Sequence, residues 1–102
     1  MDNAIQTILK DFNAHRRLSN TLTRLSKLIE QQALYAFSGD VDDIRRNYDL
    51  MLDFMRRGYT DERRNDLYDE MIGKTYRLIQ NIQVELKKKD NPSYHDAAYR
   101  LA

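Results

Sequence analysis

The sequence of 102 residues contains no cysteine. A disulfide framework, a thiolate nucleophile and a cysteine metal site are therefore excluded. The chain also starts at Met1-Asp2-Asn3, without the basic and apolar segments of a secretory signal peptide. Because neither feature points to an oxidising compartment, we expect a cytoplasmic protein.

Proline and glycine are scarce, with one proline and three glycines in the whole chain. Sandwiches and barrels of β-strands need many tight turns, and those turns depend on glycine and proline. Charged residues make up 32% of the sequence, as is common in amphipathic helices. The composition therefore predicts an all-α protein, and the apolar periodicity and short connections described below predict a three to four helix antiparallel bundle with a long first helix.

An excess of either charge is also missing. Seventeen basic residues stand against sixteen acidic ones, which gives a formal net charge of +1. A protein with this balance has no overall attraction to nucleic acid or to an anionic membrane surface. In addition, no apolar run approaches the roughly 20 residues that a membrane-spanning helix needs. We therefore expect no membrane partner.

Apolar residues recur every three or four positions, which places them on one face of an α-helix. The pattern predicts a single domain over residues 1–102, with helices at about 3–37, 41–57, 61–89 and 92–102. The first helix would be about 50 Å long, given the rise per residue of an α-helix. Its apolar face consists of Ile5, Ile8, Phe12, His15, Leu18, Leu22, Leu25 and Ile29.

Three local signals set the helix boundaries. Gly39 and Gly58 each follow an apolar stripe, and glycine readily adopts the left-handed conformation that ends a helix. Asp40 would then cap the next helix after the first glycine. The third boundary is Asn91-Pro92, since proline favours the first position of a helix. The final amphipathic segment reaches Ala102 without a stop signal, and we expect the chain to be the N-terminal domain of a longer protein.

If the first helix is long and continuous, the apolar residues of its N-terminal half have no other helix to pack against. Short connections make neighbouring helices antiparallel, so the second helix can reach only the C-terminal half of the first. Ile5, Ile8, Leu9 and Phe12 would then lack an intramolecular partner, which predicts a homodimer or a contact with the remainder of a longer chain. A break near Leu18-Ser19-Asn20-Thr21 is the alternative. The steady phase of the stripe favours the continuous helix.

Reactive side chains are few. His15 and His95 are the only histidines, and neither has the partners of a three-ligand metal site, although Asp11 stands one helical turn before His15. No glycine-rich phosphate loop and no nucleophile motif is present. The sequence therefore predicts no catalytic residue, no metal and no cofactor, and we expect a protein that is not an enzyme.

Basic doublets support an alternative, nucleic-acid binding. Several arginines and lysines, however, have an acidic residue four positions before them, and this spacing indicates exposed ion pairs on a helix. The pairs are Asp42–Arg46, Asp53–Arg57, Glu70–Lys74 and Glu85–Lys89. We therefore favour a helical protein-protein interaction, scaffold or assembly module, with a small nucleic-acid-associated protein as the alternative. The residues that the alternative would use are Arg45, Arg46, Arg56, Arg57, Arg63 and Arg64.

Overall fold

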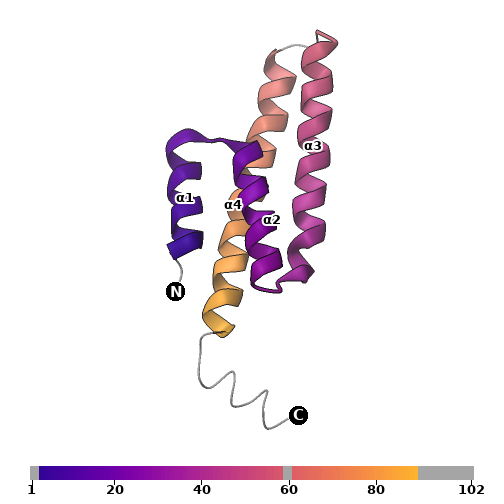
Figure 1. Ribbon diagram of the computed structural model, residues 1–102. Helices are drawn as coiled ribbons and strands as arrows, with labels where there is room; N and C mark the ends of the chain where they lie inside the picture. The colour runs from indigo at the N-terminus through magenta and orange to yellow at the C-terminus, as the bar shows by residue number, and fades with distance from the viewer. Residues whose placement is uncertain (1–2, 59–60, 90–102) are drawn as a thin grey trace.

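The computed structural model describes residues 3–58 and 61–89, and within them the chain forms an all-α bundle (Figure 1). The prediction of an all-α antiparallel bundle is confirmed. Successive helices run in opposite directions, up, down, up and down. They are α1 (Asn3–His15), α2 (Leu18–Gln31), α3 (Ser38–Arg56) and α4 (Asp61–Lys89), with a short 3-10 turn η1 (Tyr35–Phe37) before α3.

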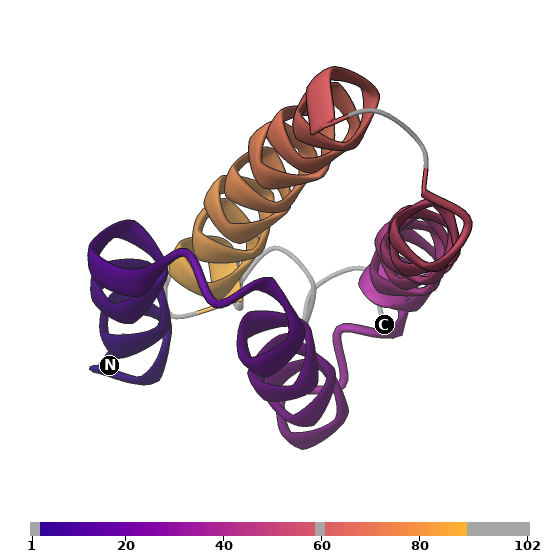
Figure 2. The same ribbon diagram turned by 90° about the horizontal axis from the view of Figure 1, so that it is seen from above.

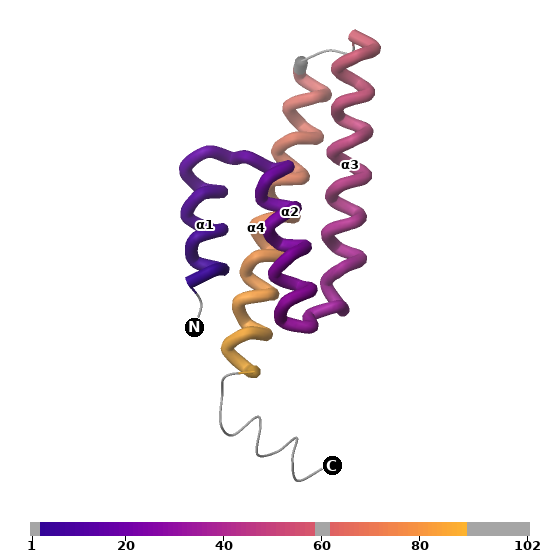
Figure 3. The backbone as a smooth tube through the Cα atoms, viewed as in Figure 1, coloured from indigo at the N-terminus to yellow at the C-terminus, as the bar shows by residue number. Residues whose placement is uncertain are grey.

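The expected continuous helix over residues 3–37 is wrong. The chain turns at Arg16-Arg17, two residues before the alternative break, and α1 folds back beside α2 (Figure 3). Arg16 has a left-handed φ of 48°, and Arg17 follows with φ −85° and ψ 81°. The Leu18 N–H then donates to the Arg16 carbonyl at 3.1 Å, which makes Arg17 the centre of a tight three-residue turn.

Burial explains why the helix breaks at this point. Ile5, Ile8 and Phe12 are 1%, 4% and 2% exposed, and they belong to the common core of the bundle. Burying three such side chains is worth about 5 to 9 kcal/mol, whereas a left-handed arginine costs about 1 to 2 kcal/mol. The premise of an unpartnered N-terminal stripe is therefore wrong, because the stripe is covered by the chain's own helices. Leu9 is half-buried against the same core.

Of the two helix stops predicted at glycines, the structure confirms one and contradicts the other. Gly58 has φ 75° and lies just past α3, with its N–H donating to the Met55 carbonyl, so its role as a helix stop is confirmed. Gly39 instead lies inside the first turn of α3, so the expected stop at this residue is wrong. α2 ends at Gln31, and the chain leaves the helix through Ala33, which has a left-handed φ of 53°. As a result, α3 begins at Ser38 rather than at residue 41.

The core runs along the axis between the helices. Viewed from above, α1 and α3 lie at opposite sides, with α2 and α4 facing each other between them (Figure 2). The most extensive packing is between α3 and α4. The bounds of α4 match the predicted range 61–89, while the expected helix at 92–102 lies outside the described residues. The buried apolar residues are Ile5, Ile8, Phe12, Leu18, Leu22, Leu25, Leu28, Ile29, Leu34, Val41, Ile44, Met51, Met71, Leu78, Ile79, Ile82 and Leu86.

The helices differ in length, and this difference leaves part of the bundle uncovered. α2 has 14 residues, whereas α3 has 19 and α4 has 29. The C-terminal part of α3 and the N-terminal part of α4 therefore project beyond the turn that joins α1 to α2 (Figure 1). In this projecting hairpin α3 and α4 pack against each other, and among the described helices no third one lies against the hairpin's outer end (Figure 1).

Candidate interaction surface

A hollow of about 430 Å³ lies where α2 begins beside the projecting hairpin. We call it the upper groove. Its residues come from the α1–α2 turn, the first turn of α2, the second half of α3 and one position of α4. They are Arg16, Arg17, Leu18, Ser19, Asn20, Tyr48, Met51, Leu52, Met55 and Tyr68.

Four residues of α3 line the upper groove at positions i, i+3, i+4 and i+7. They are Tyr48, Met51, Leu52 and Met55, and this spacing is the one with which one helix presents a face to another. Met51 is buried, Tyr48 and Leu52 are partly buried, and Met55 is 47% exposed. The apolar stripe of α3 thus changes from buried to exposed where α3 extends past the start of α2.

A tyrosine ties the groove to the α1–α2 turn. The Tyr68 hydroxyl donates a hydrogen bond to the Arg16 carbonyl at 2.7 Å, joining two residues that are 52 positions apart. Because Tyr48 and Tyr68 fall on apolar stripes of the sequence, both are expected at the edge of the core with their hydroxyls in water. Both are at the core edge, but the Tyr68 hydroxyl has a backbone partner instead.

The rim of the groove is positive. Neither the Arg16 nor the Arg17 guanidinium forms an ion pair or hydrogen bond with another described residue. Arg17 also occupies the N-cap position of α2 without a side-chain hydrogen bond, and the first turn of α2 holds no acidic residue. The first N–H groups of a helix carry partial positive charge and need acceptors, so this helix end adds to the charge of the two arginines.

Four of the six arginines of the alternative hypothesis, Arg46, Arg57, Arg63 and Arg64, have an interaction partner. Arg46 pairs with Asp43 rather than with Asp42, and Arg57 pairs with Asp53 at 3.1 Å as predicted. Arg63 lies over the Phe54 ring, 5.1 Å from its centre. Along the helices the doublets are dispersed: Arg45 and Arg46 lie in the first half of α3, whereas Arg56, Arg57, Arg63 and Arg64 surround the tip of the hairpin.

Other predicted contacts are only partly as expected. Glu70 pairs with Lys74 at 3.1 Å, as the spacing predicted. Glu85 pairs with Lys88 instead of Lys89, whose ammonium donates to the Gln32 carbonyl at the end of α2. Near the other end, Asp11 pairs with Arg24 at 2.7 Å and so joins α1 to α2.

The histidines offer little for a metal site. Asp11 is engaged by Arg24, and His15 is exposed at the end of α1. His95 lies outside the described residues. Within residues 3–58 and 61–89, no group of three potential metal-ligating side chains comes together.

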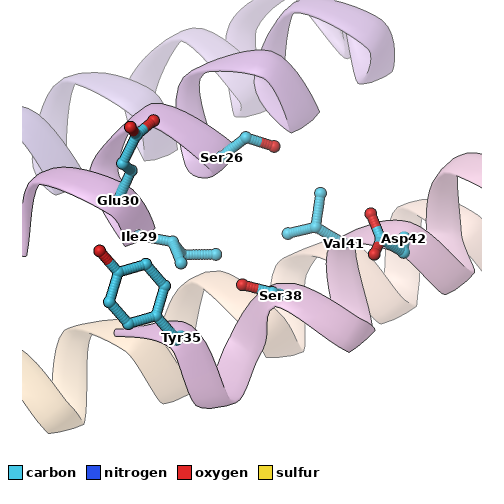
Figure 4. A pocket seen from close by; sticks show the side chains of 7 residues that line it. All are labelled: Ser26, Ile29, Glu30, Tyr35, Ser38, Val41 and Asp42. Atoms are coloured by element: carbon cyan, nitrogen blue, oxygen red, sulfur yellow. The ribbon is translucent and has the colours of Figure 1, made fainter. Parts of the chain in front are cut away.

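A second hollow, of about 350 Å³, lies between the end of α2 and the start of α3. Figure 4 shows Ile29 and Val41 facing its interior, with the carboxylates of Glu30 and Asp42 on opposite sides. Tyr35 also borders it but is 64% exposed. Glu30 and Asp42 are both exposed, and the lining of this hollow contains no basic side chain to pair with them.

Comparison with protein families, with curated proteins and with solved structures finds no match to this chain. Among the helices of the described residues, none has the combination of length and apolar character that a bilayer crossing requires. The physical features of the surface are therefore the basis for a functional proposal.

The sequence did not identify the upper groove. The spacing of Tyr48, Met51 and Met55 predicts that they share one apolar face of a helix, but it does not show how much of that face another helix covers. The groove arises because α2 is shorter than α3, and the start of α2 depends on the turn at Arg16. The signal in the sequence is that the apolar stripe of α3 is longer than the helix that packs against it.

Proposed function

We propose that this chain is a non-catalytic helical module that binds another protein. The observation that supports the proposal is the apolar face of α3, which continues from the core into the upper groove and ends at the half-exposed Met55. Thioether, aliphatic and phenol side chains line this face, and they favour packing against a partner helix rather than chemical turnover.

Nucleic-acid binding through the arginine doublets is the weaker proposal. Two of the six arginines pair with acidic residues of their own helix, and a third lies on an aromatic ring. A phosphate track would require these charges to be available along one surface. Arg45 and Arg46 lie in the first half of α3, apart from the four arginines near the hairpin tip, and the partners of several arginines within the chain favour solvated helix faces.

Co-purification with nuclease treatment separates the two proposals. The tagged chain is recovered from its native cell lysate with and without nuclease, and the bound material is identified and quantified. We expect a protein partner in near-stoichiometric amount that remains after nuclease treatment. In parallel, binding to duplex DNA and RNA should be no tighter than generic non-specific affinity, about 10⁻⁴ to 10⁻⁶ M at physiological salt.

A different outcome of these experiments would favour nucleic-acid binding. Submicromolar binding to nucleic acid that is lost in Arg45→Glu combined with Arg56→Glu, together with recovery of nucleic acid instead of protein, would replace the interaction module with the alternative.

A further inference from the structure

We propose that the upper groove binds an acidic amphipathic helix of a partner protein. The inference deepens the proposed function, on which it rests, because it assigns the binding surface and the chemistry of the partner. It is carried by the juxtaposition of a partly exposed helix face with Arg16 and Arg17, whose guanidinium groups have no partner within residues 3–58 and 61–89.

The shape of the groove favours a helix as the occupant. Its floor, from Tyr48 to Met55, continues the face of α3 against which α2 packs lower down (Figure 1). A helix laid on this floor would extend the line of α2 and complete the upper half of the bundle. Its apolar residues at i, i+3, i+4 and i+7 would interdigitate with side chains of the same spacing on α3.

Charge decides which kind of helix fits. Arg16 and Arg17 are the charged residues of the groove lining, and both are basic. They stand beside the uncapped start of α2, whose N–H groups favour an anion. Carboxylates of the partner would therefore pair with guanidinium groups that have no partner within the described residues, and arginine binds carboxylates in a bidentate geometry.

The same charges argue against a second copy. A two-fold dimer through the upper groove would place the same surface on both sides of the interface. The interface would then contain Arg16 and Arg17 of both copies with no acidic residue of the groove lining to offset them, and an excess of like charge across an interface is unfavourable. An acidic partner encounters no such repulsion.

The test measures binding of a synthetic probe to the full chain by fluorescence anisotropy. The probe is a peptide of about 14 residues, or four helical turns, with leucine at i, i+3, i+4 and i+7 and glutamate at most other positions. A matched probe carries lysine in place of every glutamate. We expect the acidic probe to bind at least about tenfold more tightly than the basic one, with an affinity that falls as salt is added.

Variants of the chain locate the binding surface. Met55→Glu should weaken binding of the acidic probe by about tenfold or more, because it introduces a carboxylate into the apolar floor. Val84→Glu is the control, since Val84 on α4 is 50% exposed and does not line the groove. Arg17→Glu should weaken binding of the acidic probe and improve binding of the basic one, whereas Arg56→Glu should change neither appreciably.

Equal binding of the two probes, or binding that survives both Met55→Glu and Arg17→Glu, would overturn the inference. So would a groove-dependent dimer, seen as a native dimer by light scattering that becomes a monomer in Met55→Glu. The proposed function has a separate outcome. If a co-purified protein partner is retained by both groove variants, the interaction module stands and the assignment to the upper groove fails.

Discussion

Arg16 and Ala33 hold left-handed backbone angles without being glycine. At Ala33 the reason is a complete helix-ending motif, in which the Leu34 N–H donates to the Ile29 carbonyl at 2.8 Å and the Ala33 N–H donates to the Glu30 carbonyl at 3.3 Å. Leu34 is buried next to the end of α2, which fixes the direction of the chain. The motif therefore forms despite the strain of a side chain at this position.

This strain predicts that Ala33→Gly stabilises the protein. Glycine removes a left-handed penalty of about 1 to 2 kcal/mol, and its greater freedom in the unfolded chain takes back part of the gain. We expect a net increase of about 1 kcal/mol in the free energy of unfolding, or about 4 to 8 °C in melting temperature. Thermal unfolding followed by circular dichroism measures this change.

Gly58→Ala is the matched comparison, with the opposite sign expected. Gly58 has φ 75°, and an added Cβ would meet nothing within 4 Å, so the penalty is purely conformational. A loss of stability at Gly58 combined with a gain at Ala33 supports the account. Unchanged or lower stability in Ala33→Gly would contradict it.

At the scale of the elements, the α1–α2 turn is held by a contact from α4. The Arg16 carbonyl accepts hydrogen bonds from both the Leu18 N–H and the Tyr68 hydroxyl. The pair of Asp11 and Arg24 joins the same two helices on their exposed side. Tyr68 therefore links the position of α1 to the wall of the upper groove.

Tyr68→Phe tests this link. Removal of the hydroxyl should lower the free energy of unfolding by about 0.5 to 1.5 kcal/mol, the usual net contribution of one hydrogen bond. The loss should concentrate in α1, where amide hydrogen exchange should accelerate more than in the middle of α4. Tyr76→Phe is the control on the same helix, because the Tyr76 hydroxyl has no hydrogen-bond partner among the described residues. Equal exchange in α1 for both variants would disprove the link.

The helices differ in how well the sequence predicts them. The range of α4 follows from a regular stripe that stays in contact with the core from Tyr68 to Leu86, and the prediction matched it. The turn at Arg16 has no such local signal, since arginine is not a residue that favours left-handed angles. It forms because distant helices bury Phe12 and its neighbours, which is a tertiary effect. Gly39 shows the converse, a residue suited to a turn that lies within a helix.

For the whole molecule, the fold-back of α1 changes which surface is available. A continuous first helix would leave its N-terminal stripe exposed, and that stripe would be the natural binding surface. In the folded-back arrangement Ile5, Ile8 and Phe12 are buried within the chain, and the exposed apolar face is found on α3 instead. The candidate site therefore depends on a single turn near the N-terminus. The stripes alone do not reveal this turn, and for this reason the sequence predicts an exposed surface at Ile5, Ile8 and Phe12 that the structure buries.

The distance between α1 and α2 tests this arrangement most directly. Ala4 and Gln31 line the same hollow between these two helices, and both are exposed. Because the chain has no cysteine, Ala4→Cys combined with Gln31→Cys provides two unique sites for spin labels. Pulsed electron paramagnetic resonance should give the short separation of adjacent packed helices, about 8 to 10 Å between axes plus the label arms. A separation of about 40 Å, as in a continuous helix over these positions, would contradict the account.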